Sequence, residues 1–120
     1  MPVAVEITKK EFGLLMVSPK GSIDSETYED FFDKINPVLS LSTKAVIMNM
    51  NDVTYVSSMG VSVLLELRKT VIGNEGIFIM VNLQPQVKKI LELLKAFLDE
   101  SIYKNVEEAQ NYFYRVRKRK

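Results

Sequence analysis

Residues 44–81, KAVIMNMNDVTYVSSMGVSVLLELRKTVIGNEGIFIMV, contain the pattern that decides the fold. Residues 44–50 and 77–81 are nearly continuous apolar runs, which are typical of strands that are buried on both faces of a sheet. Between them, residues 59–72 carry apolar side chains around most of a helical circumference and indicate a well-buried helix. A strand, a helix and a second strand in this order predict a parallel pair joined by a right-handed crossover.

The chain before this unit predicts an antiparallel hairpin. Residues 3–8 alternate loosely between apolar and polar side chains, and residues 12–18 form a second apolar run after a short turn at residues 9–11. We expect Pro19 and Gly21 to end the second strand. The hairpin makes the predicted sheet mixed rather than wholly parallel.

Three further helices are indicated by capping residues and apolar stripes. The first follows an N-cap at Asp24 or Ser25, and Pro37 kinks it or ends it early. The next begins at Pro85, which suits a first helical position, and the last follows Asn105, which is placed to begin a capping box. Their apolar stripes consist of Tyr28, Phe31, Phe32, Ile35 and Leu39, of Val87, Ile90, Leu91, Leu94 and Leu98, and of Val106, Ala109, Tyr112, Phe113 and Val116.

Together these segments give the order ββαβαβαβα, with residues 102–103 as a short last strand and residues 51–54 as a polar loop. Strands that alternate with helices after an initial hairpin predict an α/β fold. We expect a mixed β-sheet with a leading antiparallel hairpin and about four helices. The chain has 120 residues, which suits one domain over residues 1–120.

The composition excludes several classes of active site. The chain has no Cys and no His, which rules out disulfides, Cys nucleophiles, His general bases and the usual zinc sites. It also lacks a Walker A pattern and a G-x-G-x-x-G pattern. We therefore expect neither an enzyme nor a bound cofactor or metal. No apolar run approaches the roughly 20 residues of a membrane span, and the N-terminus lacks a secretory signal, so we expect a cytoplasmic protein without membrane contact.

The charges are unevenly placed along the chain. Residues 115–120 carry five positive charges, whereas residues 1–114 hold 11 basic and 15 acidic groups. This is not a generally basic surface, so we expect no direct contact with nucleic acid. The basic end suits a frayed helix terminus, where cations complement the helix dipole. Nucleic acid, an anionic membrane or an acidic partner is the alternative contact for this end.

Two short motifs stand out, Gly21-Ser-Ile-Asp24 and Val56-Ser-Ser-Met-Gly-Val61. They resemble the STAS domain of bacterial anti-sigma-factor antagonists, in which the corresponding motifs are G-x-(L/I)-D and hydrophobic-D-S-(S/A/T)-G-L. Residues 46–55 are similar to the buried strand and loop that precede the second motif in the family. The resemblance extends over about the whole chain and implies the STAS fold.

The resemblance implies that Ser58 is phosphorylated by a partner anti-sigma factor, which is itself a serine kinase. In that family the unphosphorylated protein binds the partner and the phosphorylated protein releases it, and this partner switching regulates transcription. A serine phosphatase is then expected as a further partner. Ser57 stands where the family has Asp, so the acceptor is open between Ser58 and Ser57. The alternative function is a STAS interaction module that is not phosphorylated.

The resemblance also implies a partner-binding surface around the acceptor. Asp24 matches an Asp that lies beside the acceptor in the family, and an exposed Met59 suits a partner surface because its thioether is flexible. The residues alone give plainer interpretations, in which Ser58 is an N-cap that accepts from the N–H of Gly60 or Val61, and Asp24 caps the first helix. The sequence leaves the oligomeric state open. The predicted partner-binding residues are Asp24, Asn51, Thr54, Tyr55, Ser57, Met59, Gly60 and Ser62.

Overall fold

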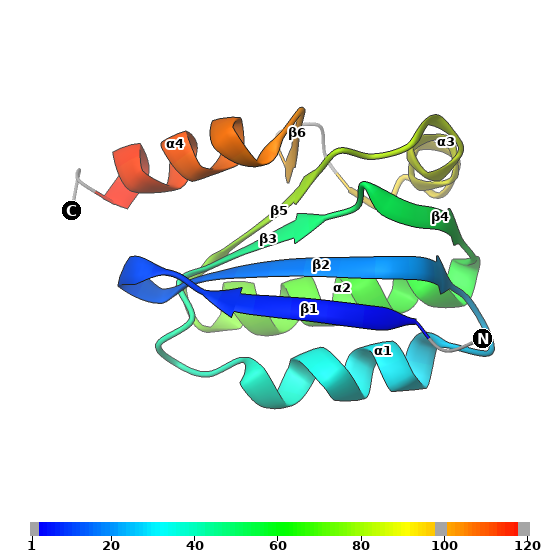
Figure 1. The fold of residues 1–120 in the computed structure, drawn as a ribbon, viewed down its shortest axis with the longest axis horizontal. Coiled ribbons are helices and arrows are strands. Elements are labelled where there is room, and N and C mark those ends of the chain that lie inside the picture. Colours follow the sequence, from blue (N-terminus) through cyan, green and yellow to red (C-terminus); the bar gives the residue numbers. More distant parts are fainter. Residues whose placement is uncertain (1–2, 98–100, 118–120) are drawn as a thin grey trace.

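The computed structural model describes residues 3–97 and 101–117, which form one mixed sheet with helices on both faces (Figure 1). The strands are β1 (Ala4–Lys9), β2 (Leu14–Ile23), β3 (Ala45–Asn49), β4 (Asp52–Val56), β5 (Ile77–Val81) and β6 (Ile102–Tyr103). The helices are α1 (Tyr28–Ile35), α2 (Ser58–Gly73), α3 (Pro85–Leu94) and α4 (Val106–Arg117), with short 3-10 helices η1 (Glu11–Gly13) and η2 (Asn36–Val38). The predicted α/β order is confirmed apart from one additional strand. Leu98 and residues 118–120, which the sequence placed in an apolar stripe and in the basic end, lie outside the described residues.

The sheet is parallel except for its first pair of strands. β1 pairs antiparallel with β2, and the order across the sheet is β1-β2-β3-β5-β6. β3 pairs in parallel with β2 from Leu14 to Val17, and β4 continues along the same edge of β2 from Lys20 to Ile23. The predicted mixed sheet with a leading hairpin is thus confirmed.

The predicted end of the second strand is wrong, because β2 runs through Pro19 and Gly21 to Ile23. Pro19 lies where the partner of β2 changes from β3 to β4, so its missing N–H costs little there. Gly21 has a φ of 114°, and the register with β4 shifts beside it. Thr54 of β4 is the extra residue of this bulge, and the left-handed backbone of Gly21 lets β2 continue opposite it instead of ending.

The predicted polar loop at residues 51–54 is also wrong, because β4 occupies most of it. Val53 and Val56 enter the core, whereas the other three residues of this strand are exposed. Polar side chains therefore dominate a strand that has only two buried positions. Because the segment has so few apolar residues, its composition is that of a loop, and the sequence did not predict a strand there.

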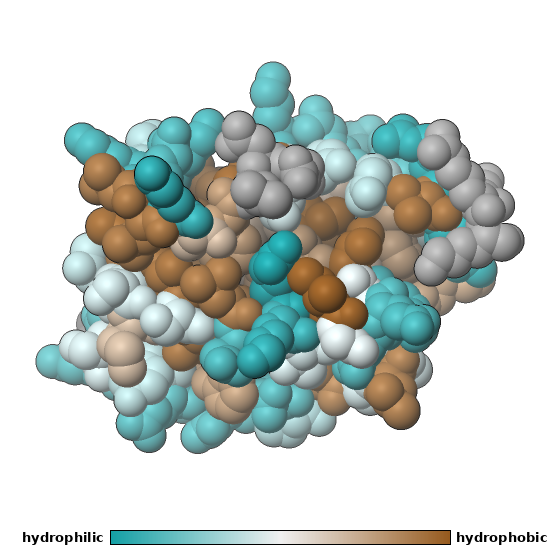
Figure 2. Space-filling view, turned by 180° about the vertical axis from the view of Figure 1, so that it is seen from behind, coloured by the Kyte–Doolittle hydropathy of each residue, from teal (hydrophilic) through white to brown (hydrophobic). Residues whose placement is uncertain are grey.

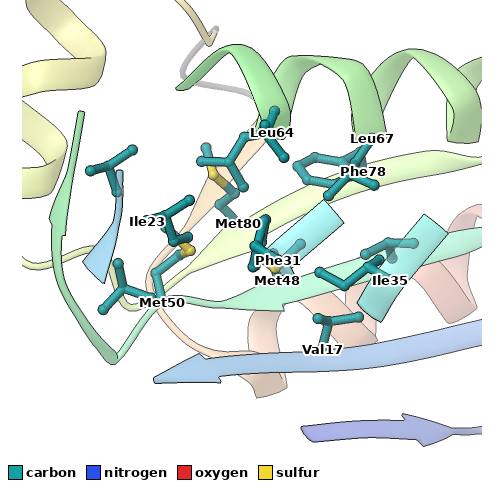
Figure 3. Packing of buried hydrophobic residues seen from close by; sticks show 14 of the residues in the cluster. Val17, Ile23, Phe31, Ile35, Met48, Met50, Leu64, Leu67, Phe78 and Met80 are labelled. Atoms are coloured by element: carbon teal, nitrogen blue, oxygen red, sulfur yellow. The ribbon is translucent and has the colours of Figure 1, made fainter. Parts of the chain in front are cut away.

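Helices α1, α2 and α3 cover one face of the sheet. In Figure 3, Val17 and Met48 of the sheet meet Phe31 of α1 and Leu64 of α2, and all four side chains are fully buried. Leu91 of α3 belongs to the same cluster. The buried helix predicted between the two apolar strands is confirmed as α2.

Helix α4 covers the opposite face of the sheet. Ala109 and Phe113 of α4 pack against Leu14, Ile47 and Ile79 of β2, β3 and β5. Because α4 lies on this face, β3 and β5 are buried on both sides, as their apolar runs predict. Within the described residues, no helix has both the length and the hydropathy that a membrane span requires.

Several predicted helix boundaries agree with the structure. Helix α1 stops at Ile35 and the chain passes into η2, which contains Pro37. Helix α3 begins at Pro85. Oδ1 of Asn105 accepts a hydrogen bond of 2.9 Å from the N–H of Glu108, so this residue caps α4 as predicted.

The start of α2 lies very close to the end of β2. Gly60 is buried there, and a Cβ atom at this position would collide with the carbonyl oxygen of Ile23 and lie 2.8 Å from Cγ1 of Val56. No other residue fits without moving the helix or the strand. Gly60 therefore sets how closely α2 approaches β2.

We predict that Gly60→Ala lowers the free energy of unfolding by about 1–3 kcal/mol or more, because the added methyl group forces α2 away from β2. Gly73→Ala is the matched control, since no atom lies within 4 Å of a Cβ built at this position in the same helix. That variant should be as stable as the wild type or slightly more stable, because alanine favours the helix. Urea denaturation of both variants measures the difference, and equal losses would contradict the proposed role of Gly60.

Candidate functional site

The two motifs found in the sequence lie side by side at one end of the sheet. Val56 of β4 pairs with Ile23 of β2. The N–H of Ser57 then donates a hydrogen bond of 3.0 Å to the carbonyl oxygen of Ile23. Asp24, which directly follows Ile23, therefore leaves β2 beside the first turn of α2.

Ser57 is the N-cap of α2. Its backbone is extended, and its Oγ accepts a hydrogen bond of 3.2 Å from the N–H of Gly60. The prediction that Ser58 is the N-cap is therefore wrong by one residue, because Ser58 is the first residue of the helix. Two adjacent serines offer the same capping chemistry, but the pairing of Val56 keeps the chain extended as far as Ser57.

Ser58 is exposed on the first turn of α2. Its hydroxyl makes no hydrogen bond to any residue that the structure describes, and its carbonyl oxygen accepts one of 3.1 Å from Oγ of Ser62. The N–H groups of Ser58 and Met59 belong to the first turn, where an α-helix offers no partner, whereas that of Gly60 is bound by Ser57. The first turn therefore presents a hydroxyl group and backbone donors to its surroundings.

Asp24 closes a turn that precedes α1. Its Oδ1 accepts hydrogen bonds from the N–H groups of Glu26, at 2.9 Å, and Thr27, at 3.1 Å. The predicted N-cap at Asp24 or Ser25 is wrong, because this turn occupies the intervening residues and α1 begins only at Tyr28. Asp24 is half-buried, and its role in partner binding stays a prediction.

Two glutamines of the α3 region cover the outer edge of β4. The side chain of Gln84 donates a hydrogen bond of 2.7 Å to the carbonyl oxygen of Asn51, and that of Gln86 donates one of 2.9 Å to the carbonyl oxygen of Thr54. No local sequence pattern indicates these contacts, because the paired residues are 33 and 32 positions apart. They hold the strand that leads into α2 and leave the side chains of Asn51 and Thr54 exposed.

The exposed side chains at the end of β4 and on the first turns of α2 are Tyr55, Ser58, Met59 and Ser62, which together we call the β4–α2 surface. Tyr55 is 51% exposed and Met59 is 40% exposed, so each offers apolar area to a partner. Gly60 is buried and is not part of this surface; it contributes by setting how closely α2 approaches β2. Figure 2 shows the side on which α2 lies, where apolar surface falls in several separate areas between polar side chains.

The β4–α2 surface supplies a phenol, a thioether and hydroxyl groups rather than a cluster of metal ligands. Within residues 3–97 and 101–117, no three Asp or Glu side chains are grouped so that they could hold a metal ion. The site thus presents exposed hydroxyl groups beside partly apolar side chains.

Solved structures share this fold at low sequence identity. SpoIIAA in its unphosphorylated form, an anti-sigma factor antagonist, is 20% identical with a TM-score of 0.76, covering 95% of this chain and 96% of that chain. An anti-sigma factor antagonist from Mycobacterium paratuberculosis is 21% identical with a TM-score of 0.78, covering 92% of each chain. At these identities the likeness establishes the fold alone.

The same fold also occurs within a membrane transporter. The murine anion transporter Slc26a9 is 20% identical with a TM-score of 0.75, but the match covers 87% of this chain and only 18% of the transporter. Comparison with curated protein sequences gave no match. A model of the STAS domain family matches residues 5–109, and the chain therefore belongs to the STAS domain family.

Proposed function

We propose that this chain is an anti-sigma-factor antagonist, which binds a partner anti-sigma factor through the β4–α2 surface. The partner is a serine kinase that phosphorylates Ser58 and is then released, and a serine phosphatase restores the binding form in the cytoplasm. The observation that carries the proposal is the exposed hydroxyl group of Ser58 on the first turn of α2. Membership of the STAS family and the fold shared with two antagonists support it.

The hydrogen bonds of the two adjacent serines favour Ser58 as the acceptor. The Oγ atom of Ser57 is half-buried and holds the N–H of Gly60, so modification there has to break the cap of α2. Loss of such a cap costs about 1 kcal/mol of stability. The hydroxyl group of Ser58 is exposed and can react without this loss.

The fold can accommodate a phosphate group at Ser58. A phosphoserine carries about −1.5 to −2 charges at neutral pH. The first turn of α2 offers unpaired backbone N–H groups and the positive end of the helix dipole, which both favour an anion. Phosphorylation therefore changes the surface without requiring that the domain refold.

A phosphate group at Ser58 opposes the binding of a partner to this surface. The phosphate group stands beside Tyr55 and Met59, which supply the apolar contact area of the surface. Covering those side chains then requires that a hydrated anion be buried as well. An added cost of about 1.4 kcal/mol weakens binding tenfold, so a free-energy cost of a few kcal/mol is enough to release the partner.

A second candidate function is a STAS interaction module that is never phosphorylated. The observation that favours it is Ser57, which stands where the family's motif has Asp and so removes a charge from the kinase's target. Such a module binds its partner constitutively, and neither ATP nor a phosphatase affects the complex.

We predict that the cognate anti-sigma kinase with Mg-ATP adds one phosphate to the wild type and to Ser57→Ala, but none to Ser58→Ala. Intact-mass spectrometry measures the modification. Ser57→Ala should also lose about 1 kcal/mol of unfolding free energy because its cap is removed, whereas Ser58→Ala should not. Modification that persists in Ser58→Ala would show that the acceptor assignment is wrong, and an unmodified wild type would favour the second candidate function.

We further predict that Ser58→Asp weakens binding to the anti-sigma factor at least about tenfold, because it places a charge inside the interface. Ser58→Ala should bind about as well as the wild type. Ser42→Asp is the control for net charge, since Ser42 is exposed in the loop before β3, at the other end of the sheet. Isothermal titration calorimetry compares the three variants, and an equal loss in Ser42→Asp would argue against the β4–α2 surface.

A further inference from the structure

A cavity of about 220 Å³ lies at the end of the sheet opposite to Ser58. It opens where the tip of the β1–β2 hairpin, the starts of β3 and β5 and the last turn of α4 come together, at the left of Figure 1. Its apolar lining comes from Phe12, Ile77, Phe113 and Val116. The proposed switch does not use this cavity.

Two residues that line the cavity have an unusual backbone conformation. Phe12 has a φ of 65° and Glu75 has a φ of 63°, and both are among the four non-glycine residues with positive φ in the described part of the chain. This conformation is rare for a bulky side chain and costs about 1–3 kcal/mol where it is imposed. At Phe12 it leaves an aromatic ring 51% exposed at the mouth of the cavity. Gly13 also has a positive φ, so Phe12 lies in the tight turn of the hairpin, and Glu75 follows the end of α2, where a left-handed residue is common. These two turns place both residues at the cavity.

The guanidinium group of Arg117 lies over this exposed ring. Its Cζ atom is 3.3 Å from the centroid of the Phe12 ring, whose edge contact with Tyr114 has a centroid distance of 6.3 Å. Stacking occupies the face of the guanidinium group and leaves the N–H groups on its edge available. In the described part of the chain, the only ion pair within 4.0 Å joins Lys34 and Asp30. Among the described residues no carboxylate lies within 4.0 Å of Arg117, so its guanidinium group can bind an anionic ligand.

Lys44 adds a second cation to the lining of the cavity. Its Nζ donates one hydrogen bond of 3.1 Å to the carbonyl oxygen of Asn74, which leaves two of its three donors for a ligand. Glu75 is the only acidic residue in the lining. Two cations against one carboxylate favour an anionic ligand over a neutral or cationic one.

The volume of the cavity and the side chains that line it restrict the size and the non-polar part of this ligand. A dry protein cavity of about 150 Å³ binds benzene, so about 220 Å³ admits one ring together with a small polar group. The ring of Phe113 in the lining offers a contact that favours another aromatic ring, whereas Arg117 already covers one face of Phe12. We infer that this cavity binds a small aromatic monocarboxylate, with its ring against Phe113, Ile77 and Val116 and its carboxylate on Arg117 and Lys44.

Titration of the full chain with phenylacetate, followed by NMR shifts of the backbone amides, tests this inference. The expected result is a saturable set of shifts at the hairpin tip, at residues 74–77 and in the last turn of α4. The neutral analogue 2-phenylethanol should bind at least about tenfold more weakly, because it cannot form charge-assisted hydrogen bonds. Equal affinity for the two compounds, or shifts that do not saturate, would overturn the assignment of an anion site.

Matched variants locate the site. Arg117→Gln and Lys44→Gln should each weaken phenylacetate binding at least about fivefold, about 1 kcal/mol by the relation between affinity and free energy. Arg115→Gln on the same helix and Lys104→Gln should leave it unchanged, since neither residue lines the cavity. Equal losses in the control variants would indicate only general attraction by positive charge and would overturn the inference.

Two further measurements test whether the ligand lies in the cavity and whether its non-polar part is aromatic. Val116→Trp fills the space and should abolish binding while the circular dichroism spectrum and the melting temperature stay close to those of the wild type. Binding that survives this substitution would show that the ligand lies elsewhere. Hexanoate should bind more weakly than phenylacetate, and equal binding would contradict the choice of an aromatic ligand. None of these results depends on whether Ser58 is phosphorylated.

Discussion

The contact between the start of α2 and the end of β2 is the constraint on which the candidate site depends. The carbonyl oxygen of Ile23 accepts the N–H of Ser57 and also forms the wall against which Gly60 must pack. One strand carbonyl therefore fixes the N-cap and the third residue of the helix at once. Ser58 lies between them, so its backbone is held beside β2 although its hydroxyl group is exposed. A group attached there changes the surface and leaves the backbone beneath it in place.

The sequence was sufficient to predict the elements in which nearly every side chain is buried. β3 and β5 have helices on both faces, so their residues are almost all apolar and the pattern cannot be mistaken for a loop. β4 has no such signal, because only Val53 and Val56 enter the core and the bulge at Thr54 shifts its register with β2 beside Gly21. The same bulge explains why a glycine that usually ends a strand lies inside β2.

At the candidate site, the sequence could place the acceptor motif but not its hydrogen bonds. Ser57 and Ser58 are chemically identical, and only the pairing of β4 with β2 decides which of them caps α2. The covering of β4 by Gln84 and the stacking of Arg117 on Phe12 join residues that are far apart in the chain. Such contacts follow from the folded arrangement of elements, and no local spacing encodes them.

The exchange of Asp for Ser at position 57 separates two properties that the family's motif combines. Asp and Ser cap helices about equally well, so the hydrogen bond from Gly60 and the start of α2 are preserved. What is lost is a negative charge near the positive end of the helix dipole, worth about 0.3–1 kcal/mol at an exposed site. The same charge would repel a phosphate on the next residue, since like charges at such short range disfavour each other. At the proposed acceptor Ser58, a phosphate would therefore be easier to accommodate beside Ser57 than beside Asp, and the cost of the exchange is the lost interaction with the helix dipole.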